Sequence, residues 1–370
     1  MKFENPLQKK EPDSFHKYLK IEPFFFWMLL FIPISTYFAW FTNNKTLVFI
    51  TSILAIIPLA RILGYCTKEI SLQSNPTIGG LLSATFGNAI ELMIAILALK
   101  EGLVMVVQAS IIGSIIGNIL LLMGIAIFFG GIRYKKQTFN KQAIGVSSTM
   151  LIIAVAGLTI PTMYNFASST GEHVETISYA VAIILALIYI AGLIFSLLTH
   201  KDLFDASDEI KTAREKPNIS KRAAAVLLFI TTAIVALESE FLVSGINEAA
   251  ANIGLTQTFI GIVLIAILTN IAETISAINF ARENKVDISF QIGLSSAIQI
   301  ALFVVPILVI ISKIFNYHFN LVFSIFGVIT MFLAVTILNH LAADGICNWL
   351  EGAQLITMYL IIATVFFFIV

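Results

Sequence analysis

The fold is decided by the stretch Gly87-Asn88-Ala89-Ile90-Glu91, which places an amide and a carboxylate inside the apolar run 78–99. A second apolar run, 259–280, contains Thr269-Asn270-Ile271-Ala272-Glu273. An Asn and a Glu three residues apart share one face of a helix. A charged side chain at membrane depth costs roughly 2.5–3.5 kcal/mol on the lower scales, so it usually marks a functional site. The two stretches therefore predict one charged site that is built from an internal repeat.

The composition is that of an integral membrane protein. Of the 370 residues, 58% are hydrophobic and 12% are charged, whereas soluble domains contain about 25% charged residues. A helix of about 20 apolar residues crosses the hydrocarbon core, and continuous rather than alternating apolar runs argue against a membrane β-barrel. We predict an all-α integral membrane protein with about 11 transmembrane helices, at residues 23–41, 46–64, 76–99, 104–130, 142–163, 175–198, 222–244, 255–281, 286–313, 318–339 and 352–370.

Lys and Arg concentrate in alternate connecting segments. One set of segments carries most of them, at 2–20, 68, 133–141, 201–222 and 282–285, and the opposite set holds only Lys45, Lys100 and Lys313. Because cytoplasmic loops carry the excess of basic residues, we predict a cytoplasmic N-terminus and a C-terminus outside. Few residues lie outside the apolar runs and no targeting signal is visible, so we expect a bacterial plasma membrane.

The two halves of the chain correspond around their Asn/Glu pairs. Each pair follows a Gly-containing helix and precedes a charged turn and a helix with small and polar residues on one face. We predict a cytoplasmic N-terminus and extra transmembrane helix in 1–45, a first five-helix repeat in 46–199, a cytoplasmic linker in 200–221 and a second five-helix repeat in 222–370. An odd number of helices per repeat inverts the second repeat in the membrane, as in many secondary transporters with a midplane site.

Two facing carboxylates suit the exchange of a cation for protons. Empty and ionised, Glu91 and Glu273 would repel each other in a low-dielectric site, whereas two protons or one divalent cation neutralise them. Cation and protons then compete for the same oxygens, so we expect antiport. Ca²⁺ prefers about six to eight oxygen ligands. The amide oxygens of Asn88 and Asn270 add to the carboxylates, and Gly87 permits a helix break that frees backbone carbonyls.

Other polar residues allow two interpretations. Four polar residues lie on the helices that follow the two Asn/Glu pairs: Ser114, Asn118, Ser296 and Gln299. They either support the glutamates or form hydrogen bonds that hold neighbouring helices together. Glu238 and Glu240 lie near the predicted outer end of their helix, and Glu69 lies near an inner end. For these three, exposure at a membrane face is the simpler explanation. Cys66 and Cys347 fall near the cytoplasmic side, where we expect no disulfide.

Four stretches, in order along the chain, carry a family resemblance: PTIGGLLSATFGNAIE at 76–91, VVQAS at 106–110, QIALFVVP at 299–306 and NWLEG at 348–352. With Gly113, Ser114, Asn118, Asp344-Gly345 and Tyr359-Leu360, they resemble the signatures of the Ca²⁺/cation antiporter superfamily, in its Ca²⁺/H⁺ exchanger (CAX) branch. The second repeat of that family usually reads Gly-Asn-Ala-Ala-Glu-His, whereas this chain has Thr269 and Thr274 in place of the Gly and the His.

The resemblance implies a secondary-active Ca²⁺/H⁺ antiporter that exports cytosolic Ca²⁺, and not an enzyme. It implies that Glu91 and Glu273 bind Ca²⁺ and protons alternately, and that further residues belong to the site or its immediate shell, namely Asn88, Asn118, Asn270 and Gln299. The expected partners are Ca²⁺, H⁺ and the lipid bilayer, with no cofactor and no nucleic acid, and a homo-oligomer stays open. The alternative is an exchanger of Na⁺, K⁺ or Mn²⁺ on the same site, ahead of a cation channel.

Overall fold

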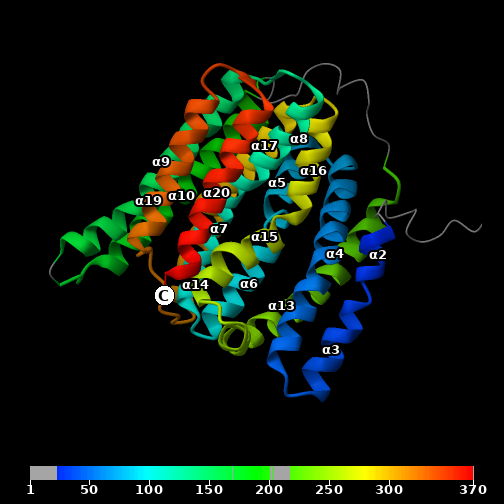
Figure 1. Cartoon of the computed structure of the whole chain (residues 1–370), viewed down its shortest axis with the longest axis vertical. Helices are drawn as coiled ribbons and strands as arrows, with labels where there is room; N and C mark the ends of the chain where they lie inside the picture. Colours follow the sequence, from blue (N-terminus) through cyan, green and yellow to red (C-terminus); the bar gives the residue numbers. More distant parts are fainter. Residues whose placement is uncertain (1–22, 169, 201–202, 204–216, 370) are drawn as a thin grey trace, which may run out of the picture.

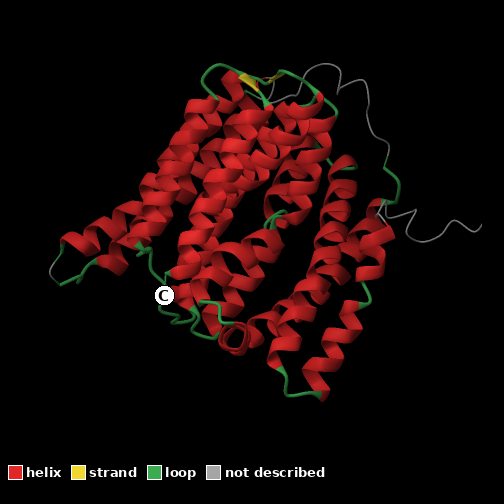
Figure 2. Cartoon of the chain, viewed as in Figure 1, coloured by secondary structure: helices red, strands yellow, loops and turns green. Residues whose placement is uncertain are grey.

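The computed structural model describes residues 23–168, 170–200, 203 and 217–369, and nearly all of its regular structure is helical (Figure 2). The first half contains α2 (Pro23–Met28), α3 (Phe31–Phe41), α4 (Lys45–Leu72), α5 (Pro76–Phe86), α6 (Ala89–Lys100), α7 (Val104–Ile116), the π-helix η1 (Gly117–Leu122), α8 (Met123–Arg133), α9 (Lys141–Ala167), α10 (Val174–Ile194) and the π-helix η2 (Phe195–Thr199). The second half contains α13 (Lys221–Ile253), α14 (Gln257–Phe259), the π-helix η3 (Ile260–Ile265), α15 (Ala266–Thr269), α16 (Ile271–Arg282), α17 (Val286–Gln299), the π-helix η4 (Ile300–Val304), α18 (Val305–Ile314), α19 (Ile325–Leu341) and α20 (Trp349–Phe368).

The prediction of an all-α integral membrane protein is confirmed, because each predicted span contains at least one helix. Within the described residues, eight helical spans are long and apolar enough to cross a membrane. A ninth is the pair Gln257–Thr269 and Ile271–Arg282, which is bent by 55°. The remaining segments are shorter, because α19 has 17 residues and α5 and α6 have 11 and 12. Eleven complete crossings therefore stay a prediction.

Two helices extend well beyond their predicted ends. The prediction ended the second span at residue 64 and the seventh at 244, but α4 continues to Leu72 and α13 to Ile253. Polar side chains near the end of α4 remain inside the fold: Glu69 accepts hydrogen bonds from the backbone N–H groups of Asn218 at 2.7 Å and Ile219 at 3.3 Å. The expectation that Glu69 is exposed is wrong, since it is 1% exposed.

Three loops with predicted cytoplasmic location meet at one end of the bundle, the upper end in Figure 1. The two short strands β1 (Gln137–Thr138) and β2 (Ile346–Cys347) pair antiparallel there. The side-chain amide of Gln137 donates to the carbonyl of Ala281 at 2.8 Å, and the backbone N–H of Asn140 donates to Asp287 at 2.9 Å. Most of the predicted linker 200–221 and the predicted cytoplasmic segment 1–22 lie outside the described residues.

The long helices α4 and α13 lie side by side, with α3 next to them (Figure 1). They run antiparallel: the N–H of Lys45, at the start of α4, donates to Glu248 near the end of α13, whereas Glu69, near the end of α4, meets residues just before α13. The helix α3, which precedes the first predicted repeat, therefore packs where α4 of the first predicted repeat contacts α13 of the second.

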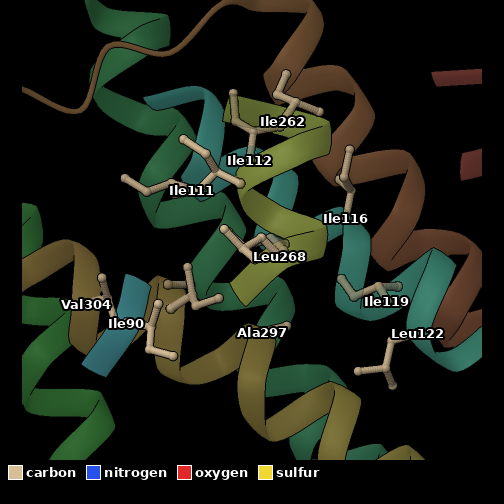
Figure 3. Packing of buried hydrophobic residues seen from close by; sticks show 14 of the residues in the cluster. Ile90, Ile111, Ile112, Ile116, Ile119, Leu122, Ile262, Leu268, Ala297 and Val304 are labelled. Atoms are coloured by element: carbon tan, nitrogen blue, oxygen red, sulfur yellow. The ribbon is translucent and has the colours of Figure 1, made fainter. Parts of the chain in front are cut away.

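The centre of the bundle is a close crossing between α7 and η3. A Cβ added to Gly113 would lie 2.2 Å from the carbonyl oxygen of Ile262, and one added to Gly261 would lie 2.7 Å from the Cβ of Ala109. Glycines let two backbones approach closely inside a membrane. Figure 3 shows Ile112 and Ile262 together at this crossing. The crossing holds η3, and hence the following α15 and α16, against the first half of the chain.

Candidate cation-binding site

Both Asn/Glu pairs lie at interruptions between two helices. Asn88 separates α5 from α6, together with Gly87, and Asn270 separates α15 from α16. Asn88 has φ −111° and ψ 20°, and Asn270 has φ −94° and ψ 9°, so the two breaks have similar backbone conformations. Glu91 and Glu273 both lie in the first turn of the helix that follows. A carboxylate at a helix N-terminus is favoured by the helix dipole.

Gly87 is required by the close approach of backbone at the first break. A Cβ at this position would lie 2.6 Å from the carbonyl oxygen of Ser83, closer than real Cβ atoms come to other atoms. Oε1 of Gln299 would lie 3.8 Å from such a Cβ, an ordinary contact distance, so the constraint at Gly87 comes from the Ser83 carbonyl. The helix break that the sequence allows at Gly87 is present, since α5 ends at Phe86 and α6 begins at Ala89.

Hydrogen bonds join polar side chains of the two halves. Asn118 Nδ2 donates to Ser296 Oγ at 2.8 Å, and Ser296 Oγ donates to Asn270 Oδ1 at 3.3 Å. Asn88 Nδ2 donates to Gln299 Oε1. Two of the participating helices continue as π-helices at this point, since Asn118 lies in η1 and Gln299 directly precedes η4. π-Helical turns are frequent at functional sites.

Three oxygens of this region are buried without a hydrogen-bond partner among the described residues. They are Oε2 of Glu91, Oε2 of Glu273 and Oδ1 of Asn118. A buried acceptor without a partner costs about 1–3 kcal/mol, and more if it is charged. These three oxygens thus provide free acceptor positions for a cation or, on the carboxylates, for a proton.

The two glutamates act on each other electrostatically. The charge of Glu91 acts on Glu273, as does that of Arg61 on α4, and Thr269 is within hydrogen-bonding range of the Glu91 carboxylate. The guanidinium of Arg61 lies 5.5 Å from the ring centroid of Phe25. Arg61 is not among the residues predicted from the sequence, although a basic residue inside the apolar run 46–64 was a visible signal.

A cavity of about 550 Å³ connects this region with the C-terminal end of α4. The predicted site residues that line it are Gly87, Asn88, Glu273, Ser296 and Gln299. Asn118 and Asn270 join it through Ser296. Glu91 and Ser114, which is buried on α7 one turn before Asn118, are not among the lining residues. Lys68 and Ser71 of α4 also line the cavity. Lys68 is predicted from the sequence only as a loop charge, because its contact with the cavity depends on the extension of α4 beyond residue 64.

Comparisons with known proteins agree with this architecture. The family model described as sodium/calcium exchanger protein matches residues 44–198 and residues 223–368. A Ca²⁺/H⁺ antiporter of Aphanothece halophytica is 40% identical over 358 residues, which are 93% of this chain and 96% of the relative. The Ca²⁺/H⁺ antiporter ChaA of Bacillus subtilis is 38% identical over 346 residues, covering 93% of this chain and 98% of the relative.

Solved structures show the same fold. The structure of native YfkE superimposes with a TM-score of 0.81 at 36% identity and covers 93% of this chain and 100% of that one. An H⁺/Ca²⁺ exchanger CAX shares the fold with a TM-score of 0.72 at 15% identity, over 93% of this chain and 91% of that one. The chain therefore belongs to the sodium/calcium exchanger family, in the branch of the Ca²⁺/cation antiporter superfamily that contains these Ca²⁺/H⁺ exchangers.

Proposed function

We propose that this chain is a secondary-active antiporter that exports cytosolic Ca²⁺ in exchange for protons. The observation that carries the proposal is the pair of buried carboxylate oxygens on Glu91 and Glu273 that have no partner among the described residues. One Ca²⁺ neutralises both carboxylates, and so do two protons. The relatives that are 40% and 38% identical over more than nine tenths of this chain are named Ca²⁺/H⁺ antiporters, which supports the same cargo here.

In this proposal the cation is bound by oxygens from both helix breaks. Glu91 and Glu273 supply carboxylate oxygens, Asn88 and Asn270 are available to supply amide oxygens, and the interrupted helices supply backbone carbonyls, which a helix end leaves without intrahelical partners. Gly87 permits the first break. The hydrogen bonds of Asn118, Ser296 and Gln299 orient the two breaks toward each other. Ser114 is buried one turn before Asn118 in the same helical span, Val104–Arg133.

Exchange follows from the penalty on an empty site. With neither cation nor protons bound, two ionised carboxylates would face each other in a low-dielectric interior, and Arg61 offsets one charge at most. The site therefore changes sides only when it is loaded, which couples the outward movement of Ca²⁺ to the inward movement of protons. The similar breaks at Asn88 and Asn270, and the two separate matches to one family model, support two inverted repeats as the moving units.

Two observations favour a monovalent cation as the alternative cargo. Thr269 stands where the family usually has Gly, and it lies within hydrogen-bonding range of Glu91, so its hydroxyl is a further neutral ligand. Lys68 lines the cavity, where its ammonium group repels a divalent ion twice as strongly as a monovalent one. The alternative is therefore exchange of Na⁺ or K⁺ for protons through the same carboxylates, and Mn²⁺ is a further divalent candidate.

The test is ion flux in proteoliposomes. A proton gradient that is acid inside should drive uptake of radioactive Ca²⁺, and collapsing the gradient with a protonophore should abolish it. Glu91→Gln and Glu273→Gln should each abolish the uptake at normal membrane expression. Glu240→Gln, at an exposed carboxylate of α13, is the matched control and should transport normally. Full flux in either of the first two variants would refute the paired-carboxylate mechanism.

The same vesicles decide between the cargoes. A fluorescent pH dye inside the vesicles reports proton release when Ca²⁺, Mn²⁺, Na⁺ or K⁺ is added outside. A signal with Ca²⁺ alone, or with Ca²⁺ and Mn²⁺, supports the main proposal. A signal with Na⁺ or K⁺ and none with Ca²⁺ replaces it by the alternative, and the carboxylate variants then test whether the site is the same.

A further inference from the structure

A third carboxyl group is buried inside the bundle, on a different helix from those of the candidate site. Glu238 lies near the middle of the 33-residue helix α13 and is 0% exposed. The expectation that it is exposed near an outer helix end is therefore wrong, whereas Glu240, two residues further, is exposed as expected. Glu238 meets Ser35 of α3 and Ser52 of α4, both 0% exposed.

The hydrogen bonds of Ser35 indicate which atom carries the hydrogen. Its Oγ lies 2.7 Å from Oε1 of Glu238 and 2.8 Å from the carbonyl oxygen of Ile32. A hydroxyl has one hydrogen to donate, and a backbone carbonyl can only accept. One hydroxyl hydrogen shared between two acceptors would make two weak bonds, whereas both short contacts are full hydrogen bonds when Ser35 donates to Ile32 and the carboxyl group of Glu238 donates to Ser35. This arrangement favours the protonated, neutral form of Glu238.

Among the described residues, few donors face the carboxyl group of Glu238. Its Oε2 and the Oγ of Ser52 are buried without a hydrogen-bond partner in the part of the chain described. The described groups that act on the carboxyl are Ser35 and Ser52, and both are neutral.

The helices packed against α13 are α3, α4, α6 and α14. Charged side chains occur only on α4 and α6 among these four, at Lys45, Arg61, Lys68, Glu69, Glu91 and Lys100, and α13 itself carries Lys221, Arg222, Glu240 and Glu248.

We propose that Glu238 is a second proton-binding site, separate from Glu91 and Glu273, and that its ligand is a single proton held between α3, α4 and α13. Protonated Glu238 joins α3 to the two long helices through Ser35. Loss of the proton leaves a bare carboxylate at this three-helix contact and requires Ser35 to turn its hydrogen away from Ile32. The docking of α3, which precedes the two predicted repeats, then depends on pH. The proposal stands whether or not the paired glutamates carry Ca²⁺.

Infrared spectroscopy tests the protonation directly. A protonated carboxyl group has a carbonyl stretching band that an ionised one lacks. We expect a Glu91→Gln/Glu273→Gln variant of the full chain, in lipid at neutral pH, to keep such a band. Adding Glu238→Gln, which reproduces the neutral shape of the acid, should remove intensity equal to one carboxyl group. Adding Glu240→Gln instead is the matched control and should remove none of it.

A second variant keeps the test decisive if Glu238→Gln does not fold. Ser35→Ala removes the acceptor of the carboxyl hydrogen, so the band should remain and move to the higher frequency of a free carboxyl group. The proposal is overturned if Glu238→Gln removes no band, or if Ser35→Ala leaves the band at the same frequency. Loss of the band on addition of NaCl at constant pH would also overturn it, because the site would then bind a metal cation.

Discussion

The crossing of α7 and η3 allows a perturbation whose size follows from the geometry. In Gly113→Ala the new Cβ would lie 2.2 Å from the carbonyl oxygen of Ile262, 2.5 Å from its Cα and 2.7 Å from its carbonyl carbon. All three atoms are backbone, so no side-chain rotation relieves the overlap. Carbon atoms prefer separations of about 3.5–4.0 Å, and the two helices would therefore have to move apart by about 1 Å.

Overpacking of this kind costs typically about 1–3 kcal/mol, whereas the replacement of a helical Gly by Ala gains only about 0.5–1 kcal/mol. The middle of the two ranges leaves a net destabilisation of about 1 kcal/mol. A change of 1 kcal/mol lowers the Tm of a domain of 150–250 residues by about 2–4 °C, and the shift falls with chain length. For these 370 residues we therefore expect a fall of about 1–2 °C. Transport should fall as well, because η3 leads into α15 and the break at Asn270.

Thermal unfolding in detergent and uptake in proteoliposomes measure the two effects. Gly117→Ala is the matched control four residues further, because nothing lies within 4 Å of a Cβ at Gly117. It should leave the Tm unchanged or raise it slightly. Equal Tm values for Gly113→Ala and Gly117→Ala would refute the argument that the close crossing requires a glycine at position 113.

Four further predictions concern separate parts of the chain. Lys68→Gln should lower the KM for Ca²⁺ at low ionic strength and lose this effect in high salt, because it removes a positive charge from the cavity wall; a change that salt does not affect would contradict this. Gln299→Leu leaves the side-chain amide of Asn88 without its acceptor, so uptake should fall at normal expression, with a cost of about 1–3 kcal/mol that unfolding measures. Asn348→Ala removes the capping box of α20 and should destabilise by about 1 kcal/mol without changing the KM for Ca²⁺. Burial raises the pKa of the Cys347 thiol to about 12, so this residue should resist maleimide at neutral pH until the protein is unfolded, and rapid labelling of the native protein would count against its burial.

The sequence was sufficient to predict the class of protein and the location of the candidate site. Long apolar runs predict membrane helices because their side chains have no other stable environment, and an Asn and a Glu inside such runs are conspicuous because their burial is costly. Gly87 beside Asn88 also indicated that the first helix could be interrupted, although the span 76–99 was predicted as one helix. These inferences depend on residue type and spacing along one segment, which are local properties.

Contacts between helices could not be predicted in the same way. Glu238 and Glu240 are two residues apart on one helix, yet the first is buried against α3 and α4 and the second is exposed. A run that is apolar on nearly every side does not reveal which face a neighbouring helix will cover. For the same reason, polar residues such as Glu69 were assigned to the surface although partners distant in the chain bury them.

What the sequence by itself determined is therefore the membrane-embedded, all-helical class and the positions of Glu91 and Glu273, because the cost of transferring charge into an apolar medium depends on residue type alone. Only the tertiary structure decided that Asn118, Ser296 and Asn270 form one chain of hydrogen bonds, that Lys68 lines the cavity, and that Glu238 is enclosed by three helices. Hydrogen bonds and cavities require particular distances between atoms of different helices, and those distances exist only after the helices have packed.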